Sequence, residues 1–203
     1  MNFAPEGFLY HLLIDPLLNG LRGKLASLVM PDETVIEVAC GTGALSLVLA
    51  QKTQHVTGID LSEGMIWRAR RIVKKRKIKN ISLEVMDATD LSCYTDKQFD
   101  VALVSMALHQ FSHETALTIL TEMKRIAGRV IIGDYNYHMR PGLPARLSWF
   151  IECVAGGDHY RNFRQYMTTG GINNLAVNAG LTVRETDVTG SNVFITASCL
   201  SAL

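Results

Sequence analysis

The sequence predicts an α/β fold of the doubly wound type, in which a mostly parallel sheet is covered by helices. Short β-branched segments alternate along the chain with longer segments of helical apolar spacing. One short segment, 35–38, ends in a Gly-x-Gly turn that leads directly into a helix pattern. Acids stand at or near the ends of three successive predicted strands, as Glu37, Asp60 and Asp87. Because the carboxyl ends of parallel strands meet at one edge of a sheet, these acids should lie together.

Residues 6–30 carry leucines at three- and four-residue spacing, which predicts two short N-terminal helices. The break between them should fall at Asp15-Pro16, because Pro16 disfavours a helical residue before it and removes a backbone donor. Gly20 is a second interruption of the pattern.

The segment 35–46 reads as strand, tight turn and helix. Gly41 and Gly43 permit backbone angles and a close ligand approach that a Cβ atom would forbid. The helix begins near Ala44, and its N–H groups would point into the space where nucleotide-like ligands bind in an open α/β sheet. The turn is therefore a candidate cofactor site. A purely structural turn is the alternative, since Gly-x-Gly alone is a weak signal.

The acid before this turn indicates which ligand it would bind. Glu37 would repel a pyrophosphate but would attract an ammonium or sulfonium group, which describes S-adenosyl-L-methionine. An acid, three residues and then Gly-x-Gly, here Glu37, Gly41 and Gly43, resembles the first motif of the class I S-adenosyl-L-methionine-dependent methyltransferases. A dinucleotide fingerprint would place Gly or Ala where this chain has Ser46. The resemblance implies that the cofactor-binding residues of the turn are Glu37, Ala39, Cys40, Gly41 and Gly43.

Segment 55–60 is predicted to be the second strand, with Asp60 at its end. Asp60 lies 17 residues beyond Gly43, close to the spacing of an acid that binds ribose hydroxyls. Capping of the next helix is the alternative role. The resemblance adds Leu61 and Met65 to the expected cofactor contacts.

The predicted helix 62–79 is strongly basic and carries eight of the 20 lysines and arginines of the chain. An anionic membrane surface or nucleic acid could be bound by such a cluster. No aromatic ladder for bases accompanies it, and we expect a solvated outer face, with weak contact to a membrane surface left open.

Segment 81–87 alternates as a third strand and ends in Asp87-Ala88, 27 residues after Asp60. This distance is the length of one helix and one strand, so both acids should stand at the same edge of the sheet. The resemblance implies that Asp87 binds the adenine amino group and that Ala88 lies beside it.

A fourth strand is predicted from Phe99 to Ser105, and the residues that follow it stand where reacting groups belong. The resemblance implies that Ser105 and Met106 line the cofactor and that His109 lies near the substrate. His109 is therefore the candidate catalytic residue, with a packing or capping histidine as the alternative. His113 should cap the helix 115–126 or be solvated.

The fifth strand is predicted at 129–135, after a shortened loop. Residues 136–168 occupy the place where such enzymes insert a helical substrate cover, and they carry apolar residues at helical spacing. The resemblance makes Phe150 and Tyr160 of this cover, with Tyr10 of the N-terminal helices, the candidate substrate residues. Simple packing of these side chains is the alternative.

Segments 181–188 and 193–200 form a predicted hairpin around a Thr-Gly-Ser-Asn turn. Together with the resemblance, they complete a Rossmann-like plan of seven strands, mostly parallel, with an antiparallel last strand. We expect one domain over residues 1–203, with N-terminal helices at 1–30 and the cover at 136–168.

Composition excludes several classes of protein. The content of hydrophobic residues, 48%, is that of a globular protein, and a net charge of +1 provides no overall attraction for nucleic acid.

The four cysteines are widely spaced and no metal-ligand spacing is visible, so we expect no metal site and a Cys40 that packs rather than reacts. No uncharged apolar run is long enough to span a bilayer and no secretion signal is recognised, which predicts a cytoplasmic protein.

The resulting hypothesis is a methyltransferase similar to the ubiquinone and menaquinone methylases, with S-adenosyl-L-methionine as cofactor and a small, apolar or aromatic acceptor. The alternatives are an NAD-binding oxidoreductase and a non-catalytic protein that binds an adenosyl ligand. The sequence leaves open the acceptor, the atom methylated, the use of a general base and the oligomeric state.

Overall fold

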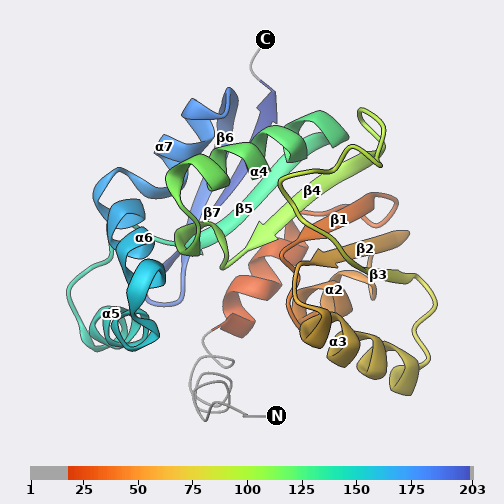
Figure 1. Cartoon of the computed structure of the whole chain (residues 1–203), viewed down its shortest axis with the longest axis horizontal. Coiled ribbons are helices and arrows are strands. Elements are labelled where there is room, and N and C mark those ends of the chain that lie inside the picture. Colours follow the sequence, from red (N-terminus) through yellow and green to blue (C-terminus); the bar gives the residue numbers. More distant parts are fainter. Residues whose placement is uncertain (1–17, 202–203) are drawn as a thin grey trace.

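A computed structural model of the chain describes residues 18–201, so Tyr10 and the predicted break at Pro16 lie outside the described residues. Seven strands form one sheet in the order β3-β2-β1-β4-β5-β7-β6, which confirms the predicted fold class (Figure 1). Pairing is parallel from β3 through β5, and β7 is antiparallel to both β5 and β6. The strands are β1 (Thr34–Val38), β2 (His55–Asp60), β3 (Ile81–Val85), β4 (Phe99–Ser105), β5 (Ala127–Tyr135), β6 (Leu181–Thr189) and β7 (Phe194–Ser201).

Helices join the strands and cover the sheet. A helix over 18–27 precedes β1, and a short 3-10 helix follows β4. Figure 1 shows α4 crossing in front of β4 and β5. The labelled helices are α2 (Ala44–Leu49), α3 (Glu63–Arg76), η1 (Leu108–Gln110), α4 (His113–Ile126), α5 (Leu143–Ala155), α6 (Gly157–Thr168) and α7 (Gly171–Asn178).

Local sequence sets the starts of two of these helices. The hydroxyl of Ser62 accepts a hydrogen bond from the backbone N–H of Met65, and Ser112 does the same for Thr115, so each serine is an N-cap. Of the two roles predicted for His113, capping was wrong, because Ser112 caps α4; His113 is the partly exposed first residue of the helix. The helix α4 leads directly into β5 at Ala127, in agreement with the shortened loop expected there.

The core lies between the sheet and its helices. Residues such as Ile36 on β1 and Leu103 on β4 are fully buried, as expected for central parallel strands. Leu25 packs against β5 at Gly133, where an added Cβ atom would meet its side chain at 2.8 Å. Gly20 interrupts the apolar pattern but not the helix over 18–27, because Leu21 and Leu25 bury the same helix in the core.

The basic helix α3 buries Ile66 and Ala69 and exposes Lys74, Lys75 and Lys77. Arg70 is also exposed, but its Nε donates to the carbonyl oxygen of Leu83 at 3.1 Å and so ties α3 to β3. In the described part of the chain, no helix has the length and apolar character needed to cross a bilayer.

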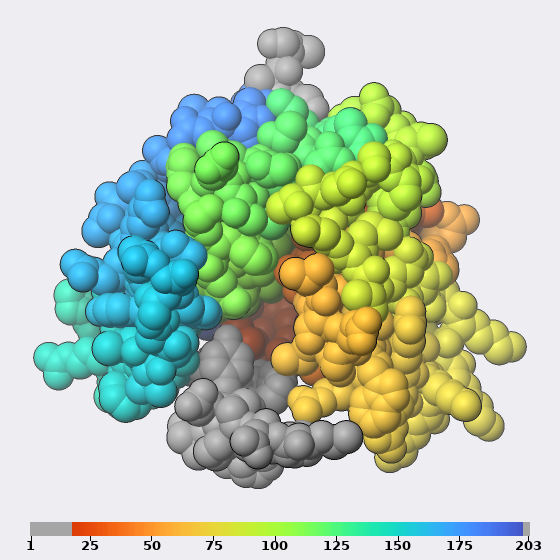
Figure 2. Space-filling view, viewed as in Figure 1, coloured from red at the N-terminus to blue at the C-terminus, as the bar shows by residue number. Residues whose placement is uncertain are grey.

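The predicted cover is helical. Its two helices α5 and α6 lie together at the left of Figure 1, away from α3 at the lower right. The space-filling view shows a small recess between the green surface and the orange surface, with red surface from the early described residues at its floor (Figure 2).

Candidate functional site

The turn after β1 has an unusual backbone. Ala39, Gly41 and Gly43 all adopt positive φ angles, of 54°, 55° and 72°. Such an angle is uncommon for a residue with a Cβ atom, so Ala39 carries local strain of the kind that clusters at ligand sites. A Cβ atom added to Gly41 would meet nothing within 4 Å, whereas one on Gly43 would meet the Cβ of Ala69 at 3.3 Å. The turn therefore borders open space at Gly41 and packs against α3 at Gly43.

Glu37 lies beneath this turn and is almost fully buried. Ser46, from the helix α2, donates a hydrogen bond to its carboxylate. Burial raises the pKa of Glu37 to about 7, although the Ser46 hydrogen bond opposes the shift. In the sequence, Ser46 is notable only because it departs from the dinucleotide pattern. No sequence signal predicts that Ser46 contacts Glu37.

Asp60 joins the ends of two strands. Its Oδ2 accepts the backbone N–H of Gly41 at 2.8 Å, and its Oδ1 accepts that of Ser62 at 2.8 Å. The negative carboxylate therefore supports the glycine turn from the neighbouring strand. Leu61, the next residue, is 71% exposed, and Met65 is half-buried one turn into α3.

Asp87 reaches the same edge of the sheet as Asp60. The backbone N–H of Met86 donates to the carbonyl oxygen of Asp60 at 3.1 Å, which brings the end of β3 beside the end of β2. Asp87 is exposed, and hydrogen bonds from the backbone and hydroxyl of Thr89 lower its pKa. Ala88 beside it is half-buried.

The end of β4 repeats the geometry of the end of β1. Met106 has a φ of 53°, and its N–H donates to the carbonyl oxygen of Gly133 at 2.8 Å. The strands β1 and β4 are neighbours, with Val38 opposite Val104, so Ala39 and Met106 form two left-handed corners at one edge. Ser105 and Met106 are both half-buried there.

Cys40 does not have the surroundings of a nucleophile. Its side chain is buried, and burial together with the charge of Glu37 raises the pKa of the thiol well above its usual value. A Cβ atom on Gly58 would meet its sulfur at 3.1 Å. These observations agree with the expectation that Cys40 packs beside the turn.

His109, in η1, is fully buried and is held by Asp134. Its Nδ1 lies 2.5 Å from Oδ1 of Asp134, whose Oδ2 accepts the backbone N–H of His109 at 3.2 Å. Its Nε2 has no hydrogen-bond partner among residues 18–201, and lies 3.6 Å from Oε1 of Glu152. Aromatic rings of Tyr135 and Phe163 surround the imidazole, with centroids at 4.8 and 6.0 Å.

Glu152 links this histidine to the cover helices. Its Oε1 accepts the hydroxyl of Tyr135 at 2.8 Å, and its Oε2 contacts Nε2 of His159. Burial lowers the pKa of His109, but the charge and hydrogen bond of Asp134 and the charge of Glu152 outweigh it and raise the pKa. Burial raises the pKa of Glu152, but His159, His109 and Tyr135 together lower it below its usual value.

No pattern in the sequence marks this cluster. Ligand atoms of His109, Glu152 and His159 all lie within 4.8 Å of one another, although Glu152 is far from His109 in the sequence. No regular spacing marks such a group, and only the docking of α5 and α6 onto η1 and β5 brings it together.

Two of the three candidate substrate residues, Phe150 and Tyr160, lie on the cover helices. Phe150 is 66% exposed on α5. Tyr160 is half-buried on α6 and stacks near Phe163 at a centroid distance of 6.5 Å. Tyr10 is outside the described residues, and the substrate roles of all three stay predictions.

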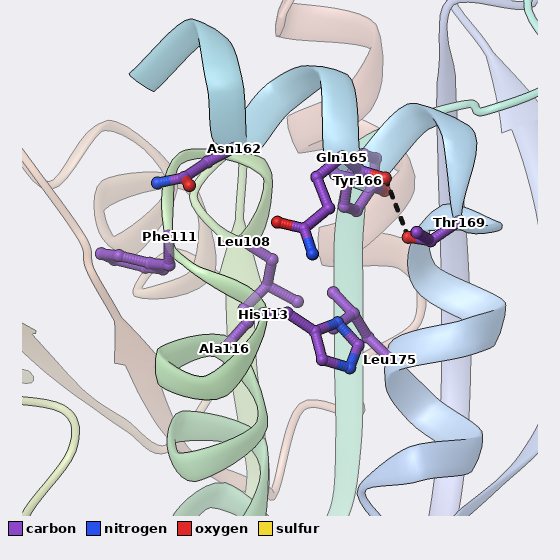
Figure 3. Close-up of a pocket in the computed structure, with 9 residues that line it drawn as sticks. All are labelled: Leu108, Phe111, His113, Ala116, Asn162, Gln165, Tyr166, Thr169 and Leu175. Atoms are coloured by element: carbon purple, nitrogen blue, oxygen red, sulfur yellow. Dashed lines mark hydrogen bonds between the residues drawn. The ribbon is translucent and has the colours of Figure 1, made fainter. Parts of the chain in front are cut away.

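A crevice between η1, α4 and α6 is lined by Asn162, Gln165 and Tyr166 on one side and by Leu108 and Phe111 on the other (Figure 3). Its volume of about 10 Å³ is at the lower limit for a single water molecule. It is therefore a packing defect rather than an acceptor site. The side-chain amide of Asn162 donates to the carbonyl oxygen of Gln110 at 2.8 Å and fixes α6 over η1.

Comparisons with known proteins find methyltransferases. Residues 35–128 match a family described as a methyltransferase domain, which confirms the predicted resemblance over that range. The chain is 25% identical over 154 residues to the ubiquinone biosynthesis O-methyltransferase of Aeromonas salmonicida, an alignment that covers 74% of this chain and 63% of that one. It is 30% identical over 109 residues to the demethylmenaquinone methyltransferase of Alkalihalophilus pseudofirmus, covering 51% and 45%. The chain thus spans less than two thirds of the length of these two relatives.

Solved structures share the fold. A SAM dependent methyltransferase from Aquifex aeolicus matches with a TM-score of 0.70 at 20% identity, over 98% of this chain and 99% of that one.

Proposed function

We propose that this chain, which matches the methyltransferase-domain family over residues 35–128, transfers a methyl group from S-adenosyl-L-methionine to a small, apolar or aromatic acceptor. One observation carries the proposal: the left-handed turn after β1 borders open space at Gly41 and is tied to Asp60 at the end of β2. This pairing provides a close backbone approach and an acid for a ribose at one edge of the sheet. The proposed unit is a single domain over residues 1–203.

The residues at this edge fit an adenosyl ligand. Open space at Gly41 leaves room that a side chain would fill. The half-buried carboxylate of Asp60 suits ribose hydroxyls and the exposed carboxylate of Asp87 suits an adenine amino group. The exposed Leu61 offers an apolar surface for the base. The proposed cofactor contacts are Glu37, Ala39, Cys40, Gly41, Gly43, Asp60, Leu61, Met65, Asp87, Ala88, Ser105 and Met106.

Catalysis would rest mainly on positioning. S-adenosyl-L-methionine, when bound, supplies a methyl group already activated by a sulfonium charge. The chain's own task is then to hold the acceptor atom in line and to exclude water, which can supply roughly 7–11 kcal/mol of the barrier. The carboxyl of Glu37 is buried beneath the turn; in its ionised form it would attract a positive ligand, and that ligand's charge would in turn favour the ionised form.

The acceptor end is proposed to lie near His109 and the cover. Asp134 occupies Nδ1 of His109, which leaves Nε2 as the ring nitrogen that faces Glu152 of the cover. Tyr10, Phe150 and Tyr160 are the proposed acceptor contacts. The relatives named for ubiquinone and demethylmenaquinone support an aromatic, quinone-like acceptor over a protein or nucleic acid.

The NAD-binding alternative is less well supported. Ser46 stands where a dinucleotide fingerprint has a glycine or alanine, and its hydroxyl is engaged by Glu37. The buried acid would also repel a pyrophosphate. A non-catalytic adenosyl-binding protein would have the same turn, so only a measurement of methyl transfer distinguishes it from a methyltransferase.

Calorimetric titration with S-adenosyl-L-methionine, S-adenosylhomocysteine and NAD tests the cofactor. We expect binding of the two adenosyl ligands and none of NAD. Incubation with a panel of phenols, quinols and amines, with product mass measured, then tests methyl transfer. Binding of NAD alone would overturn the proposal, and adenosyl binding without any methylated product across the panel would favour the non-catalytic alternative.

A further inference from the structure

We propose that His109, Glu152 and His159 form a binding site for one divalent transition-metal ion of the zinc type. The three residues come from η1, α5 and α6, and their ligand atoms lie within 4.8 Å of one another. Two imidazole nitrogens and one carboxylate oxygen are a ligand set used by zinc where a fourth position stays open. Mg²⁺ and Ca²⁺ prefer oxygen ligands throughout, so the two histidines favour a transition metal.

His109 has the arrangement of a metal-binding histidine. Its Nδ1 is held by the carboxylate of Asp134, and a carboxylate partner on one ring nitrogen is what orients most metal-bound histidines through the other. The other nitrogen, Nε2, is fully buried and has no hydrogen-bond partner within the described residues. A buried polar atom without a partner costs free energy. A metal ion at Nε2 would supply the missing partner.

The separation of His109 from Glu152 fits a shared ion better than a hydrogen bond. Nε2 of His109 and Oε1 of Glu152 are 3.6 Å apart, which is too long for a hydrogen bond. Two atoms bound to one tetrahedral zinc ion at about 2.1 Å each would be separated by roughly 3.4 Å. Tyr135 holds Oε1 in place by donating its hydroxyl at 2.8 Å.

His159 completes the set and provides access. Its side chain is 30% exposed, whereas those of His109 and Glu152 are buried, so an ion could enter from the His159 side. Its Nε2 contacts Oε2 of Glu152. A metal ion would take the place of the hydrogen bond between these two groups, and because metal ligands must be deprotonated, its binding is expected to release protons.

The apolar surroundings favour retention of an ion once bound. The rings of Tyr135, Phe163 and Tyr166 pack around His109 with centroids at 4.8, 6.0 and 6.3 Å. Three protein ligands leave one position for water or for an oxygen of a hydroxylated small molecule. Metal binding itself does not require methyl transfer, so its test is independent of the proposed function.

The test uses the full chain, freed of metal with a chelator and titrated with Zn²⁺ by calorimetry in two buffers of different ionisation enthalpy. Co²⁺ serves as a second probe, because its visible absorption reports nitrogen and oxygen ligands and its ultraviolet charge-transfer band reports thiolates. We expect one ion per chain, proton release, and a Co²⁺ spectrum without the thiolate band. The His159→Gln variant removes the most exposed ligand, and should bind Zn²⁺ at least about tenfold more weakly.

Matched variants make each result decisive. His138→Gln removes an exposed histidine outside the cluster and should bind as the parent does, as should Cys153→Ser beside Glu152. Circular dichroism checks that each variant is folded, and Glu152→Gln provides a second ligand variant if His159→Gln is not. Equal zinc binding by the parent and a folded His159→Gln chain, loss of binding in Cys153→Ser, or no binding by the parent would each overturn the proposal.

Discussion

The carboxylate of Asp60 accepts a hydrogen bond from the backbone N–H of Gly41 at 2.8 Å, which fixes the end of β2 to the glycine turn after β1. The two residues are 19 positions apart in the sequence. Asp60 is the acid expected to bind a ribose. It therefore also supports the glycine turn, which is expected to bind the same ligand.

Asp60→Asn should weaken the binding of S-adenosyl-L-methionine by roughly 1.5–3 kcal/mol, because charge-assisted bonds to the ribose would be lost. The thermal midpoint should fall only slightly, since the amide oxygen can still accept one of the two backbone bonds made by Asp60. Calorimetric titration and thermal melts measure the two effects. Asp90→Asn is the control, because Asp90 makes a similar bond to the backbone of Ser92 away from the glycine turn. Unchanged affinity in a folded Asp60→Asn chain would exclude Asp60 as the ribose acid.

The stability of the ligand-free chain should depend on pH through Glu37. Its pKa is raised from 4.5 to about 7 by burial, so between these values the folded chain binds more protons than the unfolded chain. The free energy of unfolding should therefore fall as pH rises from about 4.5 past 7, by roughly 3 kcal/mol from this group. Glu37→Gln lacks this dependence, and its stability relative to the parent should increase with pH.

Urea unfolding at pH 5 and pH 8 tests this pH dependence of the free energy of unfolding. Glu63→Gln, which replaces an exposed acid on α3, is the control. Ser46→Ala removes a hydrogen bond that lowers the pKa of Glu37, and should move the transition to higher pH. Parallel pH curves for the parent and Glu37→Gln would show that Glu37 does not titrate in this range.

Gly58→Ala should destabilise the chain by roughly 1–3 kcal/mol, because overpacking of a tight site forces its neighbours to move. The added Cβ atom would meet Leu83 at 2.8 Å, and both Cys40 and Ser46 at 3.1 Å. Gly23→Ala, in the helix over 18–27, is the matched control. Its Cβ atom would meet nothing within 4 Å, and it should stabilise the chain by up to about 1 kcal/mol. Denaturant midpoints that move in the same direction for both variants would contradict this account of packing around β2.

Phe150→Ala should weaken the binding of hydrophobic phenols or quinols, measured with S-adenosylhomocysteine present, by about 1–2 kcal/mol if Phe150 contacts the acceptor. The side chain is 66% exposed, so its truncation should leave the thermal midpoint nearly unchanged. Val177→Ala, which truncates another exposed apolar side chain on α7, should bind the ligands as the parent does. A clear preference for charged amines that Phe150→Ala does not alter would contradict the proposal of an apolar acceptor.

Much of the fold could be predicted because its determinants are local. The β-branched run of β1, the Gly-x-Gly turn and the acid Asp60 are each recognisable within a few residues, and the parallel order follows from their alternation with helices. Gly20 interrupts the apolar pattern of the helix over 18–27 without ending the helix. The burial of Leu21 and Leu25 overrides the low helix propensity of that glycine.

The sequence alone determined the sheet and the identity of the residues at its carboxyl edge, because strand periodicity and glycine turns act over short distances. Only the tertiary structure decided what those residues contact. Glu37 is paired with Ser46 beneath the turn, and the ring of His109 lies between Asp134 and Glu152, residues that no periodic pattern relates. Such contacts depend on how α2 packs on β1 and β2 and how α5 and α6 dock on η1. That docking is set by the combined packing of many side chains, which no short stretch of sequence specifies.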